Sequence, residues 1–460
     1  MAALQLAGAG IRSVVLERGL RWPITAAHDT FCTLTDPDRR SSWMSTALPV
    51  PKYAGVLETT QVTGVTVNTG AGVGGGSLVN HGLIMQPTAE LFERSFGESV
   101  DYREMEQRWY PLALRMLGAT PIPDDVLADP HYSSARDFLA ESQAAGLRVL
   151  RPPIQVDWDV VRAEVAGRVP ASAIAGECEL GMNSGAKLSV DRTILAAAER
   201  TGRASVRVLH IVTDVTRLPT GRYRVECQRI DAFGTVLDQP VFEADYVFLA
   251  AGSMGTTQLL VRARGRGSLP NLPDAVGRFW GDCADRLAIR VGMPGPPSTG
   301  GPAHIVATDW SDPTRAISLA EFYGGASPVL GEGASGTFNM QVAEPSGWFG
   351  YDSATDTVQL TYPNDDTELD SVLDGALQRL DTANPGTRTY ETTAAFTSHP
   401  LGGAVLGRAC GPDGTVFGYP NLFVVDSSLL PGSAGAVTPA LTVTALAART
   451  VSAAVQTIKH

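Results

Sequence analysis

The stretch Ala2–Gly19, AALQLAGAGIRSVVLERG, decides the fold. Residues 1–7 place small and apolar side chains as a helix does, two glycines end that helix, and the apolar run 11–16 predicts a buried strand. The acid Glu17 follows the strand directly. In a dinucleotide-binding βαβ unit, an acid at this place accepts hydrogen bonds from the adenosine ribose. Any αβ unit that ends in a charged residue gives the same pattern, so the stretch predicts an α/β fold and leaves the ligand open.

A second stretch, residues 69–83 (TGAGVGGGSLVNHGL), is rich in glycine. Glycine lets a backbone approach a flat or phosphorylated ligand closely, with its N–H groups exposed. A flexible surface linker is the alternative interpretation, but such linkers are polar on both sides, and this stretch continues into Leu78, Val79 and Leu83. We therefore expect the loop to contact a cofactor.

Further segments show clear periodicity. Residues 246–260, YVFLAAGSMGTTQLL, predict a buried strand, a turn at Gly252 and a helix whose N-terminus can face an anion. Residues 305–360 alternate as an antiparallel sheet does, and residues 365–380 predict an amphipathic helix with a solvated acidic face. A three-stranded meander is predicted at residues 206–215, 223–228 and 236–242.

The composition is that of a large folded protein. Its 460 residues are 44% hydrophobic and 18% charged, which suffices for a large core. The net charge of -12 repels phosphate backbones, so nucleic acid is not an expected partner. Residues 427–448 carry no charge and are long enough to span a bilayer, but Pro431 and Pro439 would interrupt a helix there. This favours a buried loop that leads into a helix.

The cysteines show neither the pattern of a disulfide framework nor the spacing of zinc ligands. They are odd in number and far apart, with no CxxC motif and no spacing to histidine that matches a zinc site. The sequence therefore predicts no metal site and no disulfide framework, although one pair could still bond in an exported protein. The five are Cys32, Cys178, Cys227, Cys283 and Cys410.

Five motifs in order resemble the glucose-methanol-choline (GMC) oxidoreductases, and within that family the cholesterol oxidases. They are the stretches at 2–19, 70–80 and 246–260, HPLGG at 399–403 and NLFVVDSSLLPGS at 421–433. The less generic run LLVRARGRGSLPNL, residues 259–272, extends the similarity, which covers nearly the whole chain. Each motif is weak alone, and their order makes them specific together.

The resemblance implies an α/β fold with two domains. One is a Rossmann-like FAD-binding domain built from discontinuous segments, and the other is an α+β substrate-binding domain with a mixed or antiparallel sheet. We expect the FAD-binding domain at 1–21, 189–283 and 414–460, and the substrate-binding domain at 22–188 and 284–413. The glycine- and proline-rich run 292–301 fits a crossing into or within a domain.

The resemblance also implies how FAD is held. Glu17 would bind the adenosine ribose, and Val212 would touch the adenine. The flavin and pyrophosphate path would be lined by Gly74, Gly75, Gly76, Asn80, His81 and Leu83, and the remaining contacts would come from Gly252, Asp426, Ser427 and Pro439. We expect non-covalent FAD, because family members with a histidyl link carry the histidine before the asparagine, where this chain has Val79.

For the chemistry, the resemblance implies oxidation of a sterol or steroid 3β-hydroxyl to the ketone, with dioxygen as the electron acceptor. His399 matches the family's active-site histidine, which takes up or hydrogen-bonds the hydroxyl proton while the carbon-bound hydrogen leaves as hydride. Taken alone, such a histidine is more often a buried hydrogen-bonded residue. Glu321, in SLAEF, matches the glutamate that moves a proton in a coupled isomerisation of the double bond, and an edge-strand carboxylate in water is the alternative.

Two departures from the family concern the flavin. Thr438 stands in place of an asparagine, in a loop one residue longer, and we expect it beside the substrate, where one hydroxyl reaches less far than an amide. The family's first strand and GxGxxG loop would lie before Met1. We therefore expect the written start to be internal, with neighbouring strand edges exposed. Any export signal would be missing with that segment, so the expected location is secreted or cell-surface if a signal was lost, and cytoplasmic otherwise.

The expected partners are an apolar alcohol and dioxygen, with at most peripheral membrane contact to extract a sterol. The oligomeric state is open. A second hypothesis is a GMC alcohol oxidase or dehydrogenase for a non-steroid alcohol, supported by Thr438 and by the helical segment 101–170, a candidate lid. A third is a truncated, non-catalytic remnant that does not hold FAD.

Overall fold

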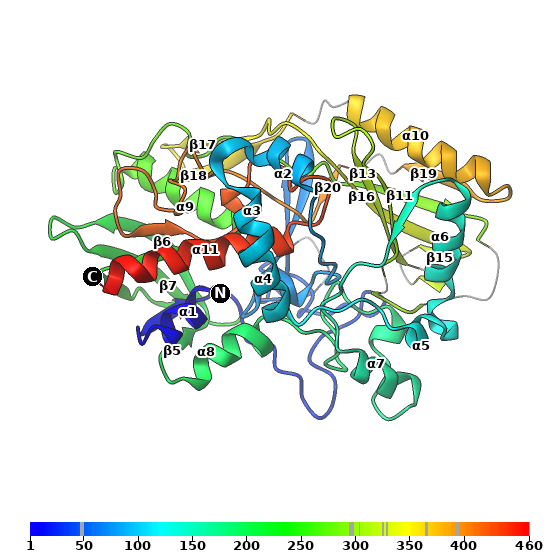
Figure 1. Cartoon of the computed structure of the whole chain (residues 1–460). Coiled ribbons are helices and arrows are strands. Elements are labelled where there is room, and N and C mark those ends of the chain that lie inside the picture. Colours follow the sequence, from blue (N-terminus) through cyan, green and yellow to red (C-terminus); the bar gives the residue numbers. More distant parts are fainter. Residues whose placement is uncertain are drawn as a thin grey trace.

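The computed structural model describes residues 1–46, 50–293, 299–302, 304–323, 326–327, 330–363, 367–391 and 395–459. Two groups of elements lie side by side (Figure 1). One contains both chain ends and short parallel strand pairs, and the other contains a six-stranded sheet with the helices α6 (Ser133–Ala144) and α10 (Thr367–Ala383). The predicted α/β fold is confirmed, and the division into domains stays a prediction.

The parallel strands form two separate pairs. The strand β1 (Ser13–Leu16) pairs with β5 (Ala204–Arg207), and β10 (Val247–Leu249) pairs with β21 (Leu422–Val424). The helix α1 (Ala2–Gly8) packs beside both pairs, because Leu6 shares a cluster with residues of β10 and of the loop after β21. The predicted order of helix, strand and acid is thus confirmed, and among the described residues the two pairs do not join into one sheet.

The helices α9 (Gly252–Arg266) and α11 (Ala440–Lys459) form the centre of this half. The predicted strand, glycine turn and helix at 246–260 are confirmed by β10 and α9. In the described part of the chain, α11 is the helix whose length and composition could cross a membrane, but half of it is buried in the protein. It packs on α1 and on α4 (Tyr110–Leu117), which is how a core helix behaves.

The six-stranded sheet is antiparallel throughout, as predicted. Its order is β19 (Arg388–Glu391), β11 (Arg286–Val291), β16 (Ala334–Gln341), β13 (Ile317–Tyr323), β12 (Val306–Asp309) and β4 (Arg148–Leu150). Side chains alternate between the two faces. One face, with Leu319, packs in a cluster with α6 and α10, whereas the other, with Ala320 and Met340, belongs to the main core.

The predicted meander needs a correction. Residues 206–215 are not one strand, because β5 ends at Arg207 and pairs with β1, while β6 (His210–Arg217) belongs to another sheet. The break lies at Leu209, whose φ is 59°. The strand β6 pairs with β7 (Tyr223–Ile230), which in turn pairs with β8 (Val236–Asp238) and β9 (Val241–Ala244). Apolar residues alternate on both sides of the break, and the adjacent pair Val208 and Leu209, where the alternation shifts by one residue, is its local sign.

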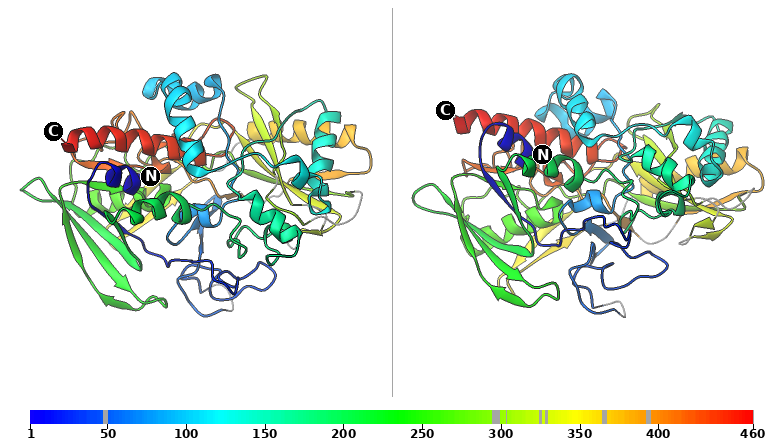
Figure 2. Two further views of the ribbon diagram at one scale, coloured as in Figure 1. Left: turned by 60° about the horizontal axis from the view of Figure 1, so that its bottom comes forward. Right: turned by 90° about the horizontal axis from the view of Figure 1, so that it is seen from below.

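The remaining elements frame these two groups. Figure 2 shows the largely irregular segment after β1 running across the underside of the molecule. The segment 101–170 is mostly helical, as predicted, the predicted helix at 365–380 is described from Thr367 onward, and the run 292–301 lies in part outside the described residues. The other strands are β2 (Leu57–Val62), β3 (Val65–Gly70), β14 (Ala326–Ser327), β15 (Gly331–Glu332), β17 (Trp348–Asp352), β18 (Thr357–Thr361) and β20 (Phe396–Thr397). Further helices are α2 (Ala89–Phe96), α3 (Tyr102–Glu104), α5 (Asp124–Leu127), α7 (Trp158–Val165) and α8 (Ala196–Arg200).

Candidate functional site

His399 lies just after β20 and pairs with a buried carboxylate. Its Nδ1 is 3.0 Å from Oδ1 of Asp285, which is 0% exposed at the start of β11. The other carboxylate oxygen of Asp285 accepts a hydrogen bond from Thr397 Oγ1 at 2.6 Å. A carboxylate can only accept, so we assign the imidazole proton to Nδ1. This leaves Nε2 of His399 as a proton acceptor.

A second buried carboxyl group, that of Asp282, lies near the pair of His399 and Asp285. Asp282 is 1% exposed, and burial, followed by the charge of Asp285, raises its pKa to about 6. The Tyr362 hydroxyl donates to Asp282 Oδ1 at 2.8 Å, and Arg286 Nη1 lies 3.5 Å from Oδ2. Asp282 and Asp285 therefore place two buried carboxyl groups on the side of Nδ1 of His399.

An aromatic side chain contacts the imidazole of His399, and a glycine of the same motif packs against α9. The ring of Phe338, in β16, lies edge-on at 5.2 Å from the imidazole. Behind the histidine, Gly403 has a φ of +103°, and a Cβ there would come within 1.9 Å of Thr257 Oγ1 in α9. The second glycine of the HPLGG motif is therefore required by its backbone angle and by its contact with α9.

Thr438 does not offer its proton to a substrate. Its Oγ1 donates to the backbone carbonyl of Leu83 at 2.9 Å, and the residue is 6% exposed. The hydroxyl thus joins the segment before α11 to the segment after the glycine loop. The prediction of Thr438 as a donor beside the substrate is corrected, because its single proton is already used within the chain.

Glu321 lies on the face of the sheet that α6 covers. Its Oε1 accepts a hydrogen bond from Ser134 Oγ in α6 at 3.1 Å, and burial raises its pKa to about 7. The neighbouring Ala320 points to the opposite face, where its partner in β16 is Phe338, the residue against His399. The structure therefore does not bring Glu321 together with His399, and this placement does not fit the predicted isomerase role or a solvated edge carboxylate.

The glycine loop leaves part of its backbone open to a ligand. It forms the short 3₁₀ helix η1 (Gly75–Leu78), and a Cβ built on Gly75 or Gly76 meets nothing within 4 Å. By contrast, a Cβ on Gly74 would press on the side chain of Leu78 at 2.9 Å. Asn80, at the end of the loop, has a buried Oδ1 without a hydrogen-bond partner among the described residues. An open backbone and an unpaired buried oxygen fit a cofactor that lies along this loop.

Two of the predicted FAD contacts, Asp426 and Ser427, bind backbone N–H groups at the start of α9. Asp426 accepts hydrogen bonds from Gly252 N at 3.0 Å and from the side chain of Thr256, and Ser427 Oγ accepts one from Ser253 N at 2.9 Å. Burial raises the pKa of Asp426. These two side chains therefore bind the first backbone N–H groups of α9.

The remaining residues that were predicted to contact FAD lie on four different segments of the chain. Glu17 accepts a hydrogen bond from Gly19 N at 2.7 Å, and burial raises its pKa. Val212 lies in β6 at the edge of the main core, Leu83 is 6% exposed, and Pro439 accepts the first hydrogen bond of α11.

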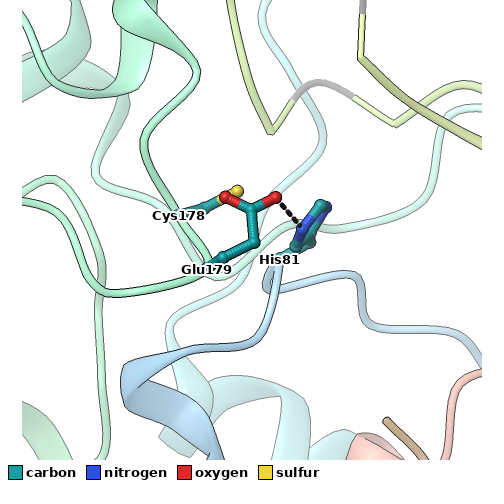
Figure 3. A group of neighbouring side chains, drawn as sticks. All are labelled: His81, Cys178 and Glu179. Atoms are coloured by element: carbon teal, nitrogen blue, oxygen red, sulfur yellow. Dashed lines mark hydrogen bonds and ion pairs between the residues drawn. The ribbon is translucent and has the colours of Figure 1, made fainter. Parts of the chain in front are cut away.

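His81 belongs to a second polar group that the sequence analysis missed. Its Nε2 lies 2.9 Å from Glu179 Oε1, and Cys178 is next to that glutamate (Figure 3). The buried ammonium of Lys187 donates to the carbonyls of Leu78, Asn80 and Cys178. The glycine loop is thereby fastened to the segment 178–187. A separation of nearly one hundred residues hid this contact from any spacing rule.

Comparison with known proteins finds similarity to GMC oxidoreductases. Residues 352–447 match the family model described as GMC oxidoreductase. The chain is 24% identical to a cholesterol oxidase of Mycobacterium tuberculosis (strain H37Rv), over 98% of the chain and 88% of that protein. It is 24% identical to a cholesterol oxidase of Acinetobacter baumannii, over 98% of the chain and 91% of that protein.

Solved structures share the fold. A fungal aryl-alcohol oxidase matches with a TM-score of 0.63 at 15% identity, covering 100% of this chain and 97% of that one. Pyridoxine 4-oxidase from Mesorbium loti matches with a TM-score of 0.67 at 16% identity, covering 100% and 96%. The resemblance drawn from the five motifs is confirmed.

Proposed function

We propose that this chain, which resembles GMC oxidoreductases over nearly its full length and matches their family model at residues 352–447, oxidises an apolar alcohol with FAD and dioxygen. The observation that carries the proposal is the pairing of His399 with the buried carboxylate of Asp285. A histidine held in this way has one nitrogen fixed and the other ready to accept a proton. Sequence reasoning did not find Asp285, because 114 residues separate the partners.

FAD is the cofactor that members of this family generally bind, and the glycine loop fits it. Gly75 and Gly76 would face the cofactor, the unpaired Asn80 Oδ1 would accept a hydrogen bond from it, and Glu17 would bind the ribose. When bound, FAD supplies the hydride acceptor for alcohol oxidation. The non-covalent state is part of the proposal.

The chain's own residues would handle the proton. Nε2 of His399 takes the proton of the substrate hydroxyl, which makes the loss of hydride from the same carbon possible. Asp285 holds the ring in the required tautomer and stabilises the imidazolium that forms, as a buried carboxylate does for a catalytic histidine. Phe338 excludes water from one side of the ring.

A sterol is the first substrate to test, because the chain is similar to two cholesterol oxidases over nearly their whole length. Isomerisation is not part of this proposal, since Glu321 is bonded to Ser134 on the far face of the sheet. The same observation favours a second candidate, a non-steroid alcohol that is only oxidised. The internally bonded hydroxyl of Thr438 also favours it.

The test is flavin reduction by the full-length chain. The purified protein is incubated with FAD, desalted and mixed without oxygen with cholesterol, an aryl alcohol or pyridoxine, and bleaching of the visible flavin band is recorded. Peroxide formation is then measured in air. His399→Gln should slow bleaching by at least about a hundredfold.

A matched control is His131→Gln. His131 also pairs with an aspartate, Asp129, at 2.6 Å, but its side chain is 41% exposed near the start of α6. This variant should reduce flavin at the normal rate. Bound flavin that no alcohol of the panel bleaches would refute the proposal, and so would equal rates in wild type and His399→Gln. Failure of the chain to retain FAD would support the remnant hypothesis instead.

A further inference from the structure

A compact group of metal-ligating side chains lies outside the His399 pair. His81, Cys178 and Glu179 bring one nitrogen, one sulfur and one carboxylate oxygen to within 4.8 Å of one another (Figure 3). The Nε2 atom of His81 and the Oε1 atom of Glu179 are already 2.9 Å apart. A mixed set of nitrogen, sulfur and oxygen donors is the ligand chemistry that Zn²⁺ uses in proteins.

His304 supplies a second and independent observation. It is 3% exposed, and its ring centroid lies 5.2 Å from that of His81. Its Nδ1 donates to the backbone carbonyl of Glu321 at 2.5 Å, so Nε2 carries the lone pair. That Nε2 is buried and has no hydrogen-bond partner in the part of the chain that the structure describes. Metal-binding histidines are held in this manner, with the second ring nitrogen on a carbonyl or carboxylate.

The charges of the group suit a dication. Cys178 as a thiolate and Glu179 as a carboxylate would together balance a charge of two, and His81 and His304 would bind as neutral rings.

We propose that His81, Cys178, Glu179 and His304 bind one Zn²⁺ ion. Zinc takes ligands at about 2.0–2.3 Å in a tetrahedron, so the four side chains close inward and the hydrogen bond between His81 and Glu179 opens. The ion would tie the residue after the glycine loop to the segment 178–179 and to the start of β12. The inference does not rest on the proposed function, and a substrate assay does not enter its test.

The experiment uses the tag-free, full-length chain and Co²⁺ as a spectroscopic probe, with Zn²⁺ as the competitor. One equivalent of Co²⁺ should produce a thiolate-to-cobalt absorption band, and Zn²⁺ should abolish it. Cys178→Ser should lose the band. His304→Asn should weaken binding at least about tenfold, and asparagine tolerates the φ of 25° found there.

Cys227→Ser, which changes another buried thiol, should bind as the wild type does. If a variant does not fold, X-ray absorption is measured on the zinc-loaded wild type instead, and one sulfur neighbour per zinc is expected. The proposal is overturned if one equivalent of metal is not bound. It is also overturned if the band survives Cys178→Ser, or if the zinc has no sulfur neighbour.

Discussion

Replacing Glu321 by glutamine should make the stability of this protein less sensitive to pH. The carboxyl group is buried, its Oε1 accepts one hydrogen bond from Ser134 at 3.1 Å, and burial raises its pKa from 4.5 to about 7. A raised pKa means that the folded state prefers the protonated form. The contribution to stability is therefore complete below about pH 4.5 and is lost as the pH rises through about 7.

The size of the effect follows from the pKa shift. One unit of pKa difference corresponds to about 1.4 kcal/mol, so the penalty for the ionised carboxylate approaches about 3 kcal/mol at high pH. Between about pH 5 and about pH 8, the wild type should lose about 2 to 3 kcal/mol relative to Glu321→Gln. Glutamine has nearly the same shape and no charge, so the variant should keep the contact with α6.

The assay is reversible urea unfolding at a series of pH values for three proteins. They are the wild type, Glu321→Gln and the control Glu93→Gln, which changes an exposed acid of α2. The difference in the free energy of unfolding between wild type and Glu321→Gln should widen with pH, while the difference for the control stays constant. A Glu321→Gln difference that is constant from about pH 5 to about pH 8 would refute the reasoning, because the carboxyl group would then titrate alike in both states.

Other substitutions test the active-site pair and the packing. Asp285→Asn should lower kcat at least about tenfold, because an amide does not stabilise the imidazolium that forms at His399 during the reaction; unchanged kinetics would contradict the positioning role. Gly403→Ala should unfold the protein or abolish activity, since the new methyl group collides with a threonine of α9, whereas Gly350→Ala, which meets nothing within 4 Å, should be tolerated in activity and melting measurements. Leu446→Ala, in α11 and 1% exposed, should cost about 2–5 kcal/mol in urea unfolding, compared with less than about 0.5 kcal/mol for Leu237→Ala, which is 51% exposed.

Local patterns predicted the elements whose causes are local. The helix and strand at the start of the chain, the unit formed by β10 and α9, and the helix α10 all follow from side-chain periodicity and from glycine at their ends. The antiparallel sheet was predicted from alternation for the same reason. Periodicity did not reveal the break at Leu209, because one residue of positive φ leaves the alternation on either side intact.

Features that depend on distant contacts were not predicted. The partner of His399 lies 114 residues away, and nothing local to Asp285 marks it. Thr438 was expected beside the substrate, but a carbonyl 355 residues away takes its proton. Glu321 was matched by its motif, yet its role depends on which face of β13 it occupies, and that face is set by the packing of α6.

The sequence by itself determined the fold class and the family resemblance, and it singled out His399 as the candidate catalytic histidine, because periodicity and ordered motifs are properties of short stretches. Only the tertiary structure decided which atoms meet. It placed Asp285 within hydrogen-bond distance of His399, and it brought His81 close to Cys178 and Glu179. The physical reason is that hydrogen bonds and ligand geometry act over about 3 Å, while the sequence separations of these partners carry no record of such distances.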